Sequence, residues 1–416
     1  MINNQYSAGN NSIQLTGGGT LNENTIAFTN PIVNSGSNTW TISGSGNVSP
    51  AAPLTGNGLL NLNITCSGVC TPGGDWSQFA GTIAWAPGNG AQCRFYGTTG
   101  SANAIWNLGN STANLYNRNG GVTINLGALF GGPATTISGA SSATYLTTYS
   151  IGALNQDSTF DGRIADGSGA TALNKIGTDV LTLTGTNNTY SGGTTVNGGT
   201  LLINNFAGSG AGSGALAVNT GGTLGGTGFI ISPVNIYAGG ILSPGSPVGV
   251  LTISNSLTLN VGSISSFGLG TNSDRVNVKG NLALGGKLNV TNFGGLAAGT
   301  NTLFTYTGTL SGSLALGTMP AGYKFVLSTN VAGQVNLNVA KPVIATLRMV
   351  STNFIFTGTG GMATSNYYVL ASTNIALPLS NWTRLATNTF DAAGFFMSTN
   401  GTLPGNSQLF YQIQMP

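Results

Sequence analysis

Three aspartates and one arginine stand close together in the sequence and could do chemistry. They are Asp157, Asp161, Asp166 and Arg163, within the segment NQDSTFDGRIADGSG. Carboxylates in pairs or threes, supported by a basic residue, cleave glycosidic bonds or bind Ca²⁺. The alternative is structural, because aspartates also cap turns and pair with arginine at the surface. We favour the structural interpretation and predict no catalytic residue, no metal site and no cofactor.

The charged residues exclude other kinds of site. The 416 residues include no histidine, so a His-dependent triad and a His-ligated metal are excluded. The eleven basic residues are scattered singly from Arg94 to Arg384, without the cluster that displaces counterions from a nucleic acid. We therefore expect no nucleic-acid partner. Only 5% of the residues are charged, and so little repulsion favours association between copies.

Three cysteines offer a second kind of chemistry. Cys66 and Cys70 lie in the turn-rich stretch TCSGVCTPGGD, where a short disulfide-closed loop is possible, and Cys93 is left over. The alternative is three buried thiols. An extracellular location favours the disulfide, so we predict a bond between Cys66 and Cys70.

Aromatic residues gather in the first half of the chain and could stack on sugar rings. These are Trp76, Trp85, Tyr96, Trp106 and Tyr116. Internal packing is the favoured interpretation, because large aromatic side chains dominate protein cores.

The elements that position these residues follow from an internal repeat. The unit TVNGGTLLI at 195–203 returns as AVNTGGTLG at 217–225, as NIYAGGILS at 235–243 and, loosely, as LALGGKLNV at 282–290. Short alternating segments separated by Gly or Asn at this period are typical of a solenoid in which each repeat forms one coil. The sparse charge and the abundance of Thr, Asn, Ser and Gly also argue against helices.

The alternation predicts which side chains enter the core. Side chains with the same parity along each strand share one face, so we expect six apolar residues inside the coils: Val196, Leu201, Ile203, Leu216, Val218 and Leu224. The Gly pairs should supply positive φ at the corners. The segments at 71–78 and 87–95 should be loops on one face, which is the best candidate for contacts.

The character of the sequence changes after Pro342. About six short strands, richer in aromatics, predict a small antiparallel β-sandwich. Its core candidates are Tyr368, Trp382, Phe390, Phe396 and Tyr411. We thus predict an all-β chain with a parallel β-helix at 1–341, irregular over 1–170 and regular over 171–341, and a sandwich at 342–416.

The stretch from Lys175 to Asn205 closely resembles the autotransporter-associated β-strand repeat. It carries the pattern Lys-x-Gly, alternating Leu, Asn-x-Tyr-x-Gly-Gly-Thr and Gly-Gly-Thr-Leu, and Asp179 stands where that family usually has Gly. The resemblance implies a right-handed, pectate-lyase-like parallel β-helix outside the cell. It implies a carrier or surface stalk rather than a catalyst. The C-terminal segment looks like the small end module of such repeat proteins.

Together these observations give an ordered set of functional expectations. The first is a secreted structural rod that self-associates end to end into a homo-oligomeric filament, because the open ends of a solenoid and its sheet edges invite pairing. The second is an adhesin or glycan-binding surface protein, and the third is a polysaccharide-degrading enzyme. The start MINNQYSAGNNS has no features of a signal peptide, and no apolar run is long enough for a membrane helix.

Overall fold

The computed structural model describes residues 2–3, 11–24, 28–45, 47–85, 92–110, 112, 114–140, 142–351, 353–401 and 408–416. The chain divides into two compact units. The first comprises Met1–Phe267, Asp274–Asn289 and Thr305–Ala315. The second comprises Gly268–Ser273, Val290–Phe304 and Leu316–Pro416.

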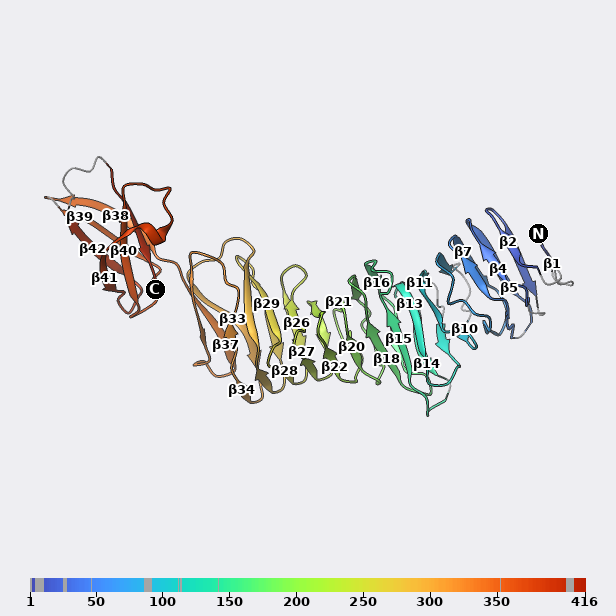
Figure 1. The fold of residues 1–416 in the computed structure, drawn as a ribbon. Coiled ribbons are helices and arrows are strands. Elements are labelled where there is room, and N and C mark those ends of the chain that lie inside the picture. Colours follow the sequence, from blue (N-terminus) through green and yellow to red (C-terminus); the bar gives the residue numbers. More distant parts are fainter. Residues whose placement is uncertain are drawn as a thin grey trace. The chain divides into compact units, whose positions relative to one another are not determined.

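The first unit is a stack of coils that follow one another along its length (Figure 1). A 15-stranded parallel sheet runs through it, with one strand from almost every coil. Its strands, in order, are β1 (Ile2–Asn3), β3 (Thr20–Asn24), β5 (Asn38–Ser43), β7 (Leu59–Ile64), β9 (Thr82–Trp85), β11 (Gly100–Asn107), β13 (Thr123–Phe130), β15 (Thr147–Ile151), β18 (Thr171–Lys175), β20 (Thr194–Val196), β22 (Leu216–Val218), β25 (Val234–Ile236), β28 (Leu257–Leu259), β31 (Leu282–Leu284) and β34 (Leu310–Gly312).

Further parallel sheets form the other walls of the coils. One contains β16 (Ser158–Phe160), β19 (Val180–Leu183), β21 (Gly199–Ile203), β23 (Gly222–Gly226), β26 (Ile241–Pro244) and β29 (Ile264–Leu269). Three others contain β2 (Ile13–Leu15), β4 (Ile32–Asn34) and β6 (Leu54–Gly56); β8 (Val69–Cys70), β10 (Gln92–Phe95), β12 (Asn114–Asn117), β14 (Thr136–Ala140) and β17 (Arg163–Ala165); and β24 (Phe229–Ile230), β27 (Val250–Ile253) and β30 (Arg275–Val278).

In-register pairing stacks like side chains from coil to coil. One inward column places Lys175 between Ile151 and Val196, and Val218 follows Val196 on the next coil. All six predicted core residues are fully buried, so the predicted alternation is confirmed. Such burial is the main stabilising term of the fold, at about 1.5–3 kcal/mol for each large apolar side chain.

Asparagines form a matching column on the outside of the same coils. The Asn197 side-chain amide donates a hydrogen bond to Asn174 Oδ1 at 2.8 Å, and Asn219 donates to Asn197 Oδ1 at 2.7 Å. Each contact joins one coil to the next and holds the two in register.

The repeated Gly pairs supply the predicted positive φ. One member of each pair has it: φ is 59° at Gly199, 84° at Gly221, 74° at Gly239 and 73° at Gly286. L-residues with a Cβ rarely adopt this region, so the corners require glycine.

The second unit contains antiparallel pairs of strands. Strand β36 (Lys324–Ser328) pairs with β37 (Gln334–Ala340). Two three-stranded sheets follow: β38 (Val343–Val350), β39 (Asn353–Thr359) and β42 (Phe396–Gly401) form one, and β40 (Asn366–Ser372), β41 (Thr383–Thr389) and β43 (Phe410–Gln414) form the other. Strands β32 (Lys287–Asn292), β33 (Gly299–Tyr306) and β35 (Ala315–Leu316) lie where the chain passes between the units.

The core of the C-terminal sandwich differs in part from the prediction. Phe390 and Phe396 are buried in it and Tyr411 packs against it, as expected. Tyr367 enters the core in place of Tyr368, whose ring carries the Arg384 guanidinium 4.6 Å from its centroid. The Trp382 indole lies outside the core and donates a hydrogen bond to the Leu377 carbonyl. Tyr367 and Tyr368 exchange places because neighbouring strand residues face opposite sides, whereas Trp382 lies before β41 (Thr383–Thr389), at the end of the 3₁₀ turn Leu379–Asn381.

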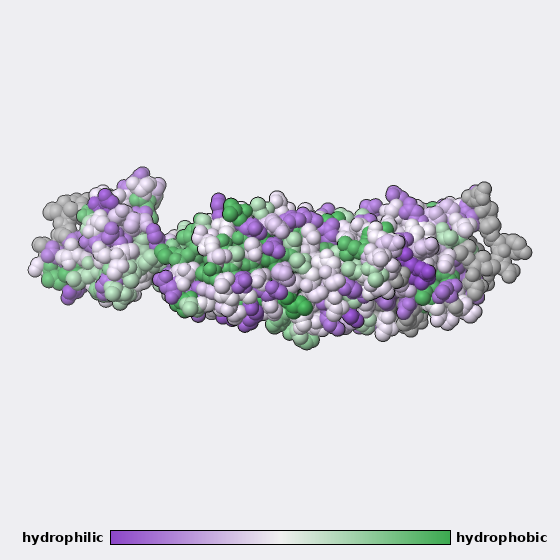
Figure 2. Space-filling model, turned by 90° about the horizontal axis from the view of Figure 1, so that it is seen from below, coloured by the Kyte–Doolittle hydropathy of each residue, from purple (hydrophilic) through white to green (hydrophobic). Residues whose placement is uncertain are grey.

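The predicted fold class is confirmed as a parallel β-helix with small antiparallel sheets toward the C-terminus. Within the described residues the helical structure is the 3₁₀ turn η1 (Leu379–Asn381), and none of their helices could cross a bilayer. In Figure 2 most of the visible surface has intermediate hydropathy, with small polar and apolar areas interspersed. That pattern follows from the many Thr, Ser and Gly residues on the outside.

Candidate functional site

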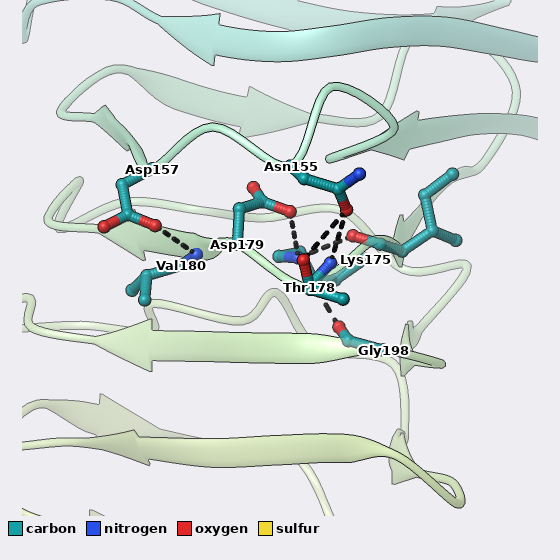
Figure 3. A network of polar contacts seen from close by, with 8 residues as sticks. Asn155, Asp157, Lys175, Thr178, Asp179, Val180 and Gly198 are labelled. Atoms are coloured by element: carbon teal, nitrogen blue, oxygen red, sulfur yellow. Dashed lines mark hydrogen bonds and ion pairs between the residues drawn. The ribbon is translucent and has the colours of Figure 1, made fainter.

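A buried ion pair lies at the start of the repeat (Figure 3). Lys175, at the end of β18, places its Nζ 2.9 Å from Asp179 Oδ1, and neither side chain is exposed. The same Nζ donates hydrogen bonds to the Ile176 carbonyl at 2.6 Å and to the Gly198 carbonyl at 3.4 Å. The ammonium group thus joins two successive coils. Asp179 Oδ2 has no hydrogen-bond partner, so the carboxylate is held by its ion pair with Lys175.

Glycines make room for this ion pair. A Cβ on Gly199 would lie 2.3 Å from the Asp179 carbonyl oxygen and 2.8 Å from Lys175 Nζ. A Cβ on Gly177 would lie 2.0 Å from the Gly152 carbonyl oxygen. Both distances are far below normal van der Waals contact, so these positions hold the coils close only because they are glycine.

Each predicted aspartate is engaged by a neighbouring coil. Asp157 Oδ1 accepts a hydrogen bond from the Val180 backbone at 2.8 Å (Figure 3), and Asp161 Oδ1 accepts one from the Thr184 hydroxyl. Asp166 Oδ1 accepts hydrogen bonds from the backbone N–H groups of Thr171 at 2.7 Å and Ser191 at 3.0 Å.

Arg163 extends the same arrangement, because its Nη2 donates to the Thr189 hydroxyl at 3.0 Å. The residues come from different parts of one coil: Asp157 precedes β16, Asp161 follows it, and Asp166 follows β17. Among the described residues no group of three His, Cys, Asp or Glu side chains forms a metal-ligand set. Each of the four residues thus makes a side-chain hydrogen bond to a neighbouring coil.

The aromatic cluster is largely internal. Trp76 and Trp106 are fully buried and stack with ring centroids 6.3 Å apart, and Trp40 joins them at 5.9 Å from Trp76. Trp85 is also buried. Trp76 and Trp85 therefore cannot serve as platforms for a sugar. The segment at 71–78 is irregular but places Trp76 in the core, and Gln92–Phe95 is strand β10 rather than loop. Residues 86–91 lie outside the described residues.

The three cysteines are buried free thiols, so the predicted bond between Cys66 and Cys70 is not formed in this structure. Cys70 is fully buried, and it stands in register with Cys93 of the next coil, in the ladder between β8 and β10. Burial raises the pKa of the Cys70 thiol well above its ordinary value, and burial also raises that of Cys66. Both thiols are therefore protonated and poorly reactive at neutral pH.

A buried carboxyl lies in the first described coils. Glu23 on β3 is fully buried, and its Oε1 accepts a hydrogen bond from the Phe28 backbone at 3.0 Å while Oε2 accepts one from the Trp40 indole at 3.1 Å. Burial raises the pKa of Glu23 to about 7, and the two hydrogen bonds offset only part of that rise. Sequence reasoning missed this residue, although its position two after the buried Leu21 indicates an inward face.

An open groove of about 640 Å³ lies on one side of the coils beside β16, β19 and β21. Its volume is within the usual range for ligand sites. The side chains that matter for its chemistry are Pro133, Asp161, Arg163, Asn187, Asn204 and Phe206. Two of the sequence-predicted residues, Asp161 and Arg163, thus share a site, whereas Asp166 lines a separate depression with Tyr116. Sequence reasoning missed Phe206.

Two comparisons with known proteins found similarity to this chain. Residues 173–203, which hold the buried ion pair, match the passenger-associated-transport-repeat family. A stretch of 182 residues, 41% of the chain, is 37% identical to the adhesin BmaC autotransporter of Brucella suis biovar 1, and it spans 5% of that protein. Residues 173–203 of this parallel β-helix are thus similar to a passenger-associated-transport-repeat, and part of the chain is similar to a short part of an autotransporter adhesin.

Proposed function

We propose that the chain is a secreted, surface-exposed protein of the adhesin type, in which a β-helical stalk presents its side to a binding partner. The observation that carries the proposal is the passenger-associated repeat within a continuous parallel β-helix. The similarity to an autotransporter adhesin supports it. A β-helix suits the role, because each coil contacts only its neighbours and a long lateral surface stays available.

The proposal includes no catalysis. Glycoside hydrolysis requires two carboxyl groups facing one substrate. Asp161 lines the lateral groove, whereas Asp157 and Asp166 do not, and each of the three carboxylates accepts a hydrogen bond that joins coils. This arrangement favours a structural use of the carboxylates.

Display on a non-adherent bacterium tests the adhesin proposal. The chain, fused to an unrelated surface anchor, should raise adherence to at least one of three surfaces, namely cultured epithelial cells, matrix-coated plates and polysaccharide-coated beads, by at least tenfold over the anchor alone. Protease sensitivity on intact cells would confirm that the chain is exposed. Exposed chain with no gain in adherence on any surface would refute the proposal.

Self-association into a filament is a second candidate function, favoured by strand β38. Among the described strands, this eight-residue strand is an edge of its sheet and pairs with β39 alone. Leu347 stands opposite the buried Phe356, and Met349 stands opposite Phe354. Directly opposed residues share a face, so both side chains lie on the core side of the sheet. They are nevertheless 61% and 55% exposed, and neither belongs to the buried core cluster or packs against it. Such an edge favours pairing with another strand.

Charge at this edge should abolish self-association. We expect the double variant Leu347→Lys/Met349→Lys to remain a single species in analytical ultracentrifugation at concentrations where the parent chain forms larger assemblies. Ile375→Lys is the matched control, because this exposed side chain lies in the same unit outside the strands. A monodisperse parent chain under electron microscopy, or double-variant assemblies like those of the parent, would exclude this use of β38.

A further inference from the structure

The lateral groove is built from the turns of four successive coils. Pro133 follows β13, Asp161 follows β16 and precedes Arg163 at the start of β17, Asn187 follows β19, and Phe206 follows β21. Coils in a β-helix are about 4.8 Å apart, so these four turns extend over about 14 Å along the stack. The groove is thus elongated, and it accepts a chain-like ligand better than a compact one.

The groove combines an exposed ring with polar groups. The Phe206 side chain is 83% exposed, and it has no ring contact with another described residue. The exposed Asn187 side chain makes no hydrogen bond to the described residues. Asp161 keeps one carboxylate oxygen beyond its bond with Thr184, and Arg163 keeps donors beyond its bond with Thr189. A single exposed Phe is common on protein surfaces. A Phe beside three polar groups in one groove is a pattern that fits a ligand.

Much of the groove is fixed before any ligand arrives. Thr184 and Thr189 hold Asp161 and Arg163, and Asn204 Oδ1 accepts a hydrogen bond from the Thr227 backbone at 3.0 Å. The floor is tight as well, because a Cβ on Gly185 would lie 2.1 Å from the Gly162 carbonyl oxygen. A preformed site loses little conformational entropy when it binds.

We infer that this groove binds a stretch of a neutral polysaccharide that lies along the stack of coils. The Phe206 ring contacts the apolar face of one sugar, and Asp161, Arg163 and Asn187 bond to hydroxyl groups. Asp161 and Arg163 cancel in charge, so nothing in the groove selects for an anionic polymer. A single carboxylate in the groove fits binding without cleavage. The inference rests on the proposed adhesin function and names the class of its partner.

Titration calorimetry with three neutral probes, namely cellohexaose, maltohexaose and N-acetylchitohexaose, tests the inference on the whole chain. At least one probe should bind, and Phe206→Ala should weaken that binding at least tenfold. Asn187→Ala should weaken it less. Tyr237→Ala is the matched control, because Tyr237 is an exposed aromatic on the repeat coils outside the groove. Far-UV circular dichroism and the melting temperature should be the same for all variants.

Several outcomes would overturn the inference. They are no binding of any probe, binding that Phe206→Ala leaves unchanged, release of shorter sugars on incubation, and a Phe206→Ala variant whose only change is weaker self-association. The adherence assay separates the two proposals. If Phe206→Ala adheres as well as the parent chain, the groove is not the adhesive site and the adhesin function stands. If a probe binds but the displayed chain does not adhere, the adhesin function is refuted and binding of a polysaccharide in the groove still stands.

Discussion

Replacing Lys175 with Met should cost about 3–5 kcal/mol of local stability, because it leaves the Asp179 carboxylate buried without its cation. The loss should be confined to nearby coils, since each coil of a solenoid contacts only its neighbours. Unfolding of such an array need not be two-state, so hydrogen exchange of individual peptides is the right measurement. Peptides covering 171–203 should exchange much faster than in the parent chain, and peptides covering 234–259 should not.

Two further variants isolate the ion pair. Lys175→Met/Asp179→Asn should recover most of the lost protection, because removing both charges of a buried pair is far less damaging than removing one. Asp157→Asn should change stability by less than about 0.5 kcal/mol, because this side chain is at the surface. If Lys175→Met exchanges like the parent chain, the ion pair does not hold these coils together.

Raising the pH from 4 to 8 should destabilise the N-terminal coils by about 3 kcal/mol through Glu23. Its pKa is about 7 in the folded chain against 4.5 for an ordinary glutamate. Between these values the folded state binds more protons than the unfolded state. The contribution is therefore fully present below pH 4.5 and is lost as the pH rises through 7.

The control variant is Glu23→Gln, which keeps the size of the side chain but cannot ionise. The guanidinium midpoint of the parent chain should fall relative to that of the variant as the pH rises from 4 to 8. All other titrating groups are common to both chains. The chain contains no histidine, so no imidazole titrates in the neutral pH range. Parallel pH profiles for the two chains would show that Glu23 ionises normally in the folded state.

The coils were predictable because their signal is local. Alternation placed Val196, Leu201 and Ile203 inside one coil, and the recurring Gly pairs marked the corners where φ is positive. Alternation, and the presence of each Gly pair, can be recognised from residues a few positions apart. Both signals can therefore be recognised without knowing which coil stacks on which.

The ion pair could not be recognised so easily. A lysine in a sequence usually indicates a solvated surface, and the aspartate that replaces the usual glycine of the repeat offers no partner by itself. The available signal was that Lys175 has the same parity as the buried Leu173, which places it on the inner face. Its stabilising contact with Asp179 then depends on the turn between β18 and β19, whose geometry the sequence pattern does not specify.

The groove depends on the alignment between coils. Asp161 and Thr184 are 23 residues apart and meet only when their coils stack in register. Phe206 follows the Asn204–Asn205 corner, and its exposure depends on where that turn points. The same limit applies to Tyr367 and Tyr368, because a one-residue change of phase exchanges the inner and outer side chains.

The column of asparagines at 174, 197 and 219 has a consequence for how such a chain can change over evolutionary time. Asn174 and Asn197 are 23 residues apart, and the same amide contact recurs on the following coil. Duplication or loss of a gene segment that encodes one whole coil therefore keeps the remaining asparagine amides in register with one another. Gain or loss of a single codon shifts one coil by one residue and breaks that register. Natural variants of this protein should therefore differ in length by complete turns, while the packing of the retained turns stays the same.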